Sequence, residues 1–183
     1  MLVAARGADK LRQLLLQQNI RPWGTAASAG EARRMLAGGA PALTVINAPL
    51  PDETGVELAM ELAGATPSGV LLLVKAELMS MVYGPASEAG VLTVSKPLNP
   101  LLFEQAVLLG RAMHSRLRRL EDENAKLARR LEDMRVIDRA KCLLIERMRI
   151  TETEAHRAIE KQAMDTRQSR AQVARGILGK YEL

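Results

Sequence analysis

The sequence predicts an α/β unit with a doubly wound parallel sheet, followed by a coiled-coil helix and an all-α unit of three helices. Three observations lead to this prediction. Short apolar runs alternate with amphipathic stretches over residues 1–108, no strand pattern recurs beyond residue 99, and helix-capping patterns divide the last third of the chain. Strands that alternate with helices at this spacing are typical of parallel sheets with helices on both faces.

The α/β unit is expected to contain five strands and four intervening helices. The strands are predicted at residues 1–5, 22–26, 43–47, 70–75 and 91–95, of which the second is the weakest pattern. The helices are predicted at residues 9–18, 29–37, 55–62 and 79–88. We therefore predict three regions, with boundaries at 1–108 for the α/β domain, 109–134 for a linker helix and 135–183 for the C-terminal domain.

A long helix is expected over residues 101–148, where Gly110 is the one candidate breaker. Apolar residues recur in it with the heptad spacing of a coiled coil. The predicted dimer seam places Leu117, Asn124 and Leu131 at a positions and Met113, Leu120, Leu127 and Met134 at d positions. An asparagine at an a position pairs with its twin and favours a parallel dimer. A homodimer is thus expected; the alternative is that this stripe packs against the chain's own globular part.

The last third of the chain shows the start signals of two further helices. Thr151 with Glu154, and Ser169 with Gln172, fit capping boxes, and Gly179 is the expected helix terminator. Apolar residues at helical spacing predict the core of this unit: Ile137, Ala140, Leu144, Met148, Ala155, Ile159, Ala163, Val173, Ile177 and Leu178.

The positive charge is concentrated in the C-terminal part. Residues 1–110 hold 8 Lys and Arg against 9 Asp and Glu, a net of −1, while residues 111–183 hold 18 against 12, a net of +6. A basic helical region indicates a polyanionic partner, although a solvated basic surface is the alternative. Aromatic residues make up 2% of the chain, so few rings are present on which bases would stack.

Several classes of function find little support in the composition. Cys142 is the single cysteine, and His114 and His156 are the only histidines, so neither a disulfide nor a cysteine- or histidine-rich metal site is expected. No catalytic constellation, cofactor motif, secretory signal or membrane-spanning stretch is evident. We expect a cytoplasmic protein that is not an enzyme and has no cofactor and no membrane contact.

Residues 1–108 resemble the receiver domain of response regulators, a flavodoxin-like fold of two-component systems. The resemblance rests on the run from Leu43 to Leu58, with its Pro-x-x-x-Gly loop, and on Val94-Ser-Lys-Pro-Leu-Asn-Pro. In that family an aspartate at the end of the third strand accepts a phosphoryl group, and an acidic pair after the first strand holds magnesium. These roles are what the resemblance implies for the matching positions.

The phosphoryl-transfer residues of that family are replaced in this chain. Asn47 stands at the acceptor position, Ala5-Arg6-Gly7 replaces the acidic pair, and Lys96 is the one matching site residue. Lys75 or its neighbour stands where the family has a switch Thr or Ser, and Asp52 lies too far from the strand end to be a good substitute acceptor. Magnesium lacks carboxylate ligands here. We therefore interpret this region as a pseudo-receiver that binds a protein partner or its own dimer mate. We expect it to be controlled by a partner, such as a sensor protein, or by a ligand, and not by phosphorylation.

Residues 135–179 resemble an ANTAR domain, the three-helix RNA-binding module of the AmiR and NasR antitermination regulators. The matching patterns are Ile137-x-x-Ala-Lys-x-x-Leu-Ile-x-Arg, Thr151-Glu-x-Glu-Ala, Ala163-Met-x-x-Arg and Val173-Ala. The resemblance implies a transcription antiterminator that binds paired stem-loops in a messenger leader and prevents a terminator hairpin from forming. Phosphate contacts by Lys and Arg suit this role. The RNA-binding residues we predict are Lys141, Arg147, Lys161 and Arg167, followed by Arg139, His156 and Arg170.

Two other functions remain open from the sequence. A DNA-binding regulator would use the same first domain but needs a helix that enters a major groove. A protein-interaction scaffold would show no salt-dependent binding of nucleic acid at all. The sequence does not identify the inducer, the target RNA or the regulated genes.

Overall fold

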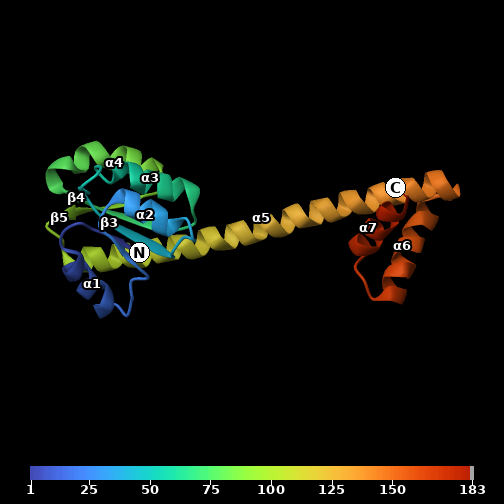
Figure 1. Ribbon diagram of the computed structural model, residues 1–183, viewed down its shortest axis with the longest axis horizontal. Helices are drawn as coiled ribbons and strands as arrows, with labels where there is room; N and C mark the ends of the chain where they lie inside the picture. Colours follow the sequence, from blue (N-terminus) through green and yellow to red (C-terminus); the bar gives the residue numbers. More distant parts are fainter. Residues whose placement is uncertain (182–183) are drawn as a thin grey trace. The chain divides into compact units, whose positions relative to one another are not determined.

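The computed structural model describes residues 1–181 and divides into two compact units, Met1–Leu120 and Glu121–Leu183 (Figure 1). The predicted C-terminal domain extends to residue 183, so its last two residues lie outside the described part. Within residues 1–181, no helix is both long and apolar enough to cross a membrane.

The first unit contains the predicted parallel sheet of five strands, and the structure gives their order as β2-β1-β3-β4-β5. The strands are β1 (Leu2–Val3), β2 (Thr25–Ala26), β3 (Leu43–Asn47), β4 (Gly69–Lys75) and β5 (Leu92–Lys96). The predicted second strand, 22–26, begins three residues later, at Thr25, where the pairing with β1 begins. The strand order reverses between β1 and β3, which places a crevice at the carboxyl ends of these strands.

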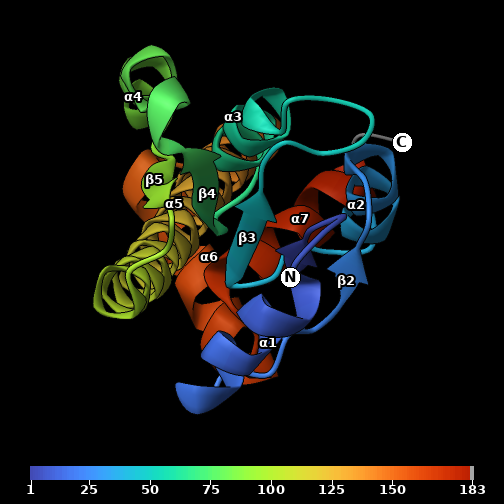
Figure 2. The ribbon, with the colours of Figure 1, turned by 90° about the vertical axis from the view of Figure 1, so that its left-hand side faces the viewer.

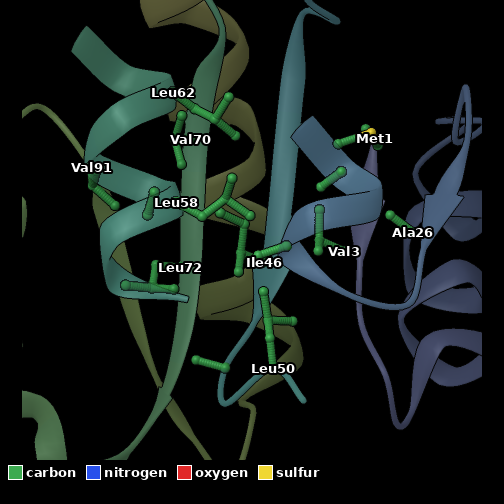
Figure 3. Close-up of a cluster of buried hydrophobic side chains, with 14 of the residues drawn as sticks. Met1, Val3, Ala26, Ile46, Leu50, Leu58, Leu62, Val70, Leu72 and Val91 are labelled. Atoms are coloured by element: carbon green, nitrogen blue, oxygen red, sulfur yellow. The ribbon is translucent and has the colours of Figure 1, made fainter. Parts of the chain in front are cut away.

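Helices cover both faces of this sheet (Figure 2). One face packs against α2 (Ala29–Leu36), α3 (Val56–Ala65) and α4 (Met79–Glu88), the last of which follows a short 3-10 turn, η1 (Ala76–Leu78). Figure 3 shows the buried aliphatic side chains of this layer, including Ile46, Leu58 and Leu72. The other face packs against α1 (Ala8–Gln17) and the first turns of α5 (Pro100–Met148), where Phe103 is fully buried.

The start of α5 is positioned by a cap and by a close backbone contact. The side chain of Asn99 accepts hydrogen bonds from the backbone N–H groups of Leu101 (2.9 Å) and Leu102 (3.4 Å). Gly110, the candidate breaker, lies within the helix. A Cβ atom added to Gly69 in β4 would lie 2.1 Å from the Gly110 carbonyl oxygen. The two glycines therefore allow α5 to approach the sheet at backbone distance.

The predicted dimer seam is exposed in the single chain along most of its length. Met113 is half-buried in the first unit, and Asn124 is exposed. The other seam residues are 38% to 61% exposed: Leu117, Leu120, Leu127, Leu131 and Met134. A solvated row of large apolar side chains at heptad spacing is what a coiled-coil partner would cover.

The second unit packs the end of α5 against α6 (Glu152–Thr166) and α7 (Arg170–Tyr181). Both predicted capping boxes are confirmed. The Thr151 hydroxyl accepts from the Glu154 backbone N–H and the Glu154 carboxylate from the Thr151 N–H, while Ser169 and Gln172 exchange the equivalent pair. The core consists mostly of small and branched residues: Ala140, Leu144, Ala155, Ile159, Ala163, Val173, Ala174 and Ile177.

Two details predicted for this unit are wrong. Met148 is 56% exposed because it is the last residue of α5 and lies beyond the packed turns. Gly179 does not end α7, which continues to Tyr181. A glycine costs a helix only about 1 kcal/mol relative to alanine, so a single one near the end is tolerated.

Candidate functional site

A hollow of about 510 Å³ lies at the carboxyl ends of the strands in the first unit. Its polar lining consists of Arg6, Asn47, Lys75 and Lys96. The remaining lining residues are apolar: Ala5, Ala48, Pro49, Leu50 and Pro51. The β1–α1 turn, the end of β3 and the ends of β4 and β5 bring these residues together, so the crevice expected where the strand order reverses is present.

Asn47 and Lys96 are in contact at this edge. The Lys96 ammonium donates to the Asn47 side-chain oxygen (3.0 Å) and to the Ala48 carbonyl oxygen, while the Asn47 amide nitrogen donates to the Arg6 carbonyl oxygen (2.8 Å). The Asn47 amide group thus connects the end of β3 to the β1–α1 turn and to the end of β5. Burial, and second the charge of Lys75, lower the pKa of Lys96.

The hollow does not fit the magnesium ion that receiver domains hold. Three of the lining side chains are cationic, and no lining residue is a carboxylate. Magnesium is bound through carboxylate and other hard oxygen ligands, and cations repel it. Residues 1–181 also contain no cluster of three or more His, Cys, Asp or Glu residues that would hold a metal.

Asp52 caps a helix and does not line the hollow. Its carboxylate accepts hydrogen bonds from the backbone N–H groups of Ala29 and Gly30, both at 2.9 Å, at the start of α2. These bonds hold the pKa of Asp52 below its ordinary value. The carboxylate nearest in sequence to Asn47 is therefore used to anchor the loop.

Three of the predicted RNA-binding residues of the second unit are held by carboxylates. The Lys141 ammonium pairs with Asp138 and Glu152, both at 2.9 Å, which raises the pKa of Lys141 and joins α5 to the start of α6. Glu160 contacts both His156 (3.3 Å) and Arg170 (3.1 Å), so one carboxylate links α6 to α7. Their positions serve the packing of the three helices.

Three other predicted residues present exposed cations. Arg147 lies in the last turn of α5, Lys161 in α6, and Arg167 caps α6 in a left-handed conformation (φ 54°). In the described part of the chain, none of these three forms an ion pair. Arg139, the seventh predicted residue, is also exposed.

Among the exposed arginines outside the predicted set, two lie in or directly before α6. Arg157 lies one turn before Lys161 in α6, on the side opposite the buried Ala155 and Ile159. Arg149 lies between α5 and α6 with a positive φ of 52°. Arg157 could have been found from the sequence, because it lies four residues before Lys161 and both fall on the helix face opposite the apolar stripe.

Comparison with known proteins identifies the second unit. Residues 125–178 match the family model described as ANTAR domain. The chain carries an ANTAR domain. This segment holds 13 Lys and Arg against 8 Asp and Glu, a net of +5, so the ANTAR domain accounts for most of the basic character of the chain.

A curated relative matches across both units. The chain is 26% identical over 168 residues to the transcriptional regulatory protein PdtaR of Mycobacterium tuberculosis, covering 92% of this chain and 82% of that protein. The similarity includes the ANTAR domain and extends over the α/β unit that precedes it.

Solved structures show the same fold. The response regulator StyR matches 98% of this chain and 97% of its own, with a TM-score of 0.63 and 15% identity. A two-component response regulator from Clostridium difficile matches 63% of this chain and 94% of its own, with a TM-score of 0.53 and 18% identity. The first unit thus has the receiver fold, as the sequence predicted, and the ANTAR domain follows it.

Proposed function

We propose that this protein is an RNA-binding transcription antiterminator. The observation that carries the proposal is the ANTAR domain at residues 125–178, joined to a receiver fold. The relative PdtaR is a transcriptional regulatory protein, which supports a role in transcription. Bound to paired stem-loops in a messenger leader, the protein would prevent the terminator hairpin from forming. It would act in the cytoplasm and without enzymatic activity.

The exposed cations of the ANTAR domain are the proposed RNA contacts. Arg147, Lys161 and Arg167 have no carboxylate partner in residues 1–181, so their charge is available to phosphate. Arg157 extends this set along α6, and Arg139, which is also exposed, is a further proposed contact. Lys141 and Arg170, which were also predicted as contacts, have their charge balanced by carboxylates, and the His156 ring lies 3.3 Å from the Glu160 carboxylate. We assign these three residues a smaller share of RNA affinity.

A parallel homodimer through the exposed heptad seam would present two ANTAR domains. Asn124 at an a position would fix the register by pairing with its twin. Two linked domains bind two adjacent hairpins more tightly than either binds one, because the second contact occurs at a high effective concentration. This geometry accounts for the proposed preference for paired stem-loops.

Regulation is proposed to occur through a ligand or a sensor partner and not through aspartate phosphorylation. Asn47 occupies the acceptor position, and its amide cannot form the acyl phosphate that an aspartate forms. The cationic lining of the hollow also lacks carboxylates for magnesium.

The proposal is tested with the full chain and RNA recovered by crosslinking and copurification. Mobility shifts would compare a transcript with two adjacent hairpins, the same transcript with one hairpin, and duplex DNA of equal length. The triple variant Arg147→Ala/Lys161→Ala/Arg167→Ala should reduce the salt slope of RNA binding by about 2, since each phosphate contact contributes roughly 0.7 to 0.9.

The matched control is Arg34→Ala, which removes an exposed charge from α2 of the first unit. It should bind RNA like the wild type. Equal binding by the triple variant and the wild type would refute the proposed contacts. Preference for duplex DNA would favour the DNA-binding alternative, and salt-independent or absent binding would favour a scaffold.

A further inference from the structure

The hollow in the first unit concentrates positive charge without a counter-charge. Lys75 and Lys96 are register partners on the neighbouring strands β4 and β5, and Arg6 follows β1. In residues 1–181, Arg6 and Lys75 form no ion pair, and the Lys96 ammonium donates only to two uncharged oxygens. The carboxylates that would balance a receiver site are absent from the lining.

This arrangement has an energetic cost in the absence of an anion. Like charges on directly paired strand residues repel each other. The partial burial of Lys96, and second the charge of Lys75, disfavour the charged form of Lys96 and lower its pKa. A bound anion would offset both effects, because it supplies the opposite charge and hydrogen-bond acceptors at the same place.

We propose that this hollow is a noncovalent binding site for a small phosphate-bearing ligand. Three cationic side chains from three strand ends match a dianion with several acceptor oxygens better than a single carboxylate, which has two. Its position, at the switch point of an open parallel sheet, is where such folds bind ligands.

The volume of the hollow and the apolar part of its lining indicate a ligand larger than inorganic phosphate. A volume of about 510 Å³ lies within the range of small-molecule sites, roughly 300 to 1,000 Å³. Pro49, Leu50 and Pro51 form an apolar wall in the β3–α3 loop. This wall suits the organic part of a phosphomonoester, while the cations bind the phosphate group.

Control of the ANTAR domain by such a ligand is the one part of this inference that rests on the proposed function. Ligand binding itself is measured without RNA. A failure to bind phosphate therefore leaves the RNA proposal standing, and a failure to bind RNA leaves this site standing.

Isothermal titration calorimetry of the full chain would use three probes at constant ionic strength: inorganic phosphate, glycerol 3-phosphate and acetate. Glycerol 3-phosphate should bind at one equivalent per chain and more tightly than acetate. Arg6→Gln and Lys75→Gln should each weaken this binding about tenfold, as expected for one charge-assisted hydrogen bond. Arg34→Gln removes an equal charge outside the hollow and should bind like the wild type.

Both test residues are exposed, so the variants should keep the fold, which circular dichroism would verify. Tighter binding of glycerol 3-phosphate than of phosphate would identify an organic phosphomonoester, and the reverse would identify inorganic phosphate. The proposal is overturned by absence of saturable binding, by acetate binding as tightly as both phosphates, or by equal affinity of Lys75→Gln and Arg34→Gln.

Discussion

In the first unit, three cationic side chains line one hollow that has no carboxylate in its lining. In the ANTAR domain, by contrast, some cationic side chains are paired with carboxylates and others are exposed to solvent. Lys141 and Arg170 belong to the paired class, and each joins two helices. Lys75 belongs to the unpaired class, beside a second lysine. A cationic side chain that pairs with a carboxylate of the same chain stabilises the fold. A cationic side chain without such a partner is available to an external anion.

The two units also differ in the side chains that form their cores. The first unit buries large side chains between a sheet and helices on both faces, while the ANTAR domain packs three helices through small residues such as Ala140, Ala155 and Ala174. The receiver fold is present although Asn47, Lys75 and Lys96 stand at its strand ends and no carboxylate lines the hollow there. Fold and chemistry are therefore carried by different residues, with the fold in the apolar faces and the chemistry at the strand ends.

The largest effect is expected from the ANTAR core. Ile159→Ala should lower the free energy of unfolding by about 2 to 5 kcal/mol, because it removes buried methyl groups and leaves a cavity. Met164→Ala, at a position 72% exposed in the same helix, should change it by less than about 0.5 kcal/mol. Urea unfolding followed by circular dichroism measures both. Equal losses would mean that the three-helix core is packed differently.

A second test addresses the contact between α5 and the sheet. Gly69→Ala should destabilise the first unit by about 1 to 3 kcal/mol, because the new methyl group meets the Gly110 backbone. Gly64→Ala in α3 has open space and should stabilise by about 0.5 to 1 kcal/mol. Thermal and urea unfolding of the two variants would be compared. A stable Gly69→Ala protein would contradict the close approach.

The two classes of cation in the ANTAR domain should separate in a third test. Lys141→Ala should lower the unfolding free energy by up to about 1 kcal/mol, the range of partly exposed ion pairs, with little change in the salt slope of RNA binding. Lys161→Ala should leave stability unchanged and reduce the slope by about one. Denaturation and mobility shifts at several salt concentrations measure these effects. The reverse pattern would show that Lys141 is the RNA contact.

A smaller effect is expected from pH. The backbone hydrogen bonds to Asp52 hold its pKa below the ordinary value, so its stabilising contribution is present above about pH 4 and is lost as the pH falls through the folded-state pKa. The backbone and side-chain bonds of the Thr151 cap do the same for Glu154. Asp52→Asn should therefore lose less stability than the wild type between neutral pH and pH 3. Asp122→Asn, at an exposed position of α5, is the control and should behave like the wild type.

No phosphoryl transfer is expected when the acceptor alone is restored. Asn47→Asp places a carboxylate beside Lys96, but Arg6 and Lys75 still line the hollow and magnesium still lacks its acidic pair. Intact-mass measurement after incubation with acetyl phosphate and magnesium should show no added phosphoryl group. A phosphorylated Asn47→Asp protein would show that the cations alone support the transfer.

Much of the fold was predictable because its signals are local. The run 43–47 was placed correctly as β3, and the residues of both capping boxes start helices as expected, since each signal depends on side chains within three or four positions. The helix ends were less predictable. Gly179 lies inside α7, because a glycine ends a helix only where it adopts the left-handed conformation, which Gly179 does not.

Sequence alone determined that this protein has a receiver fold with Asn47 at the end of its third strand, an ANTAR domain, and an excess of basic residues in its C-terminal part. Only the tertiary structure decided which cations are available. Lys141 meets Glu152 across two helices, and Lys75 meets Lys96 across two strands. These pairs join residues that are distant in sequence. They depend on how whole helices and strands pack, which the spacing of residues along the chain does not encode.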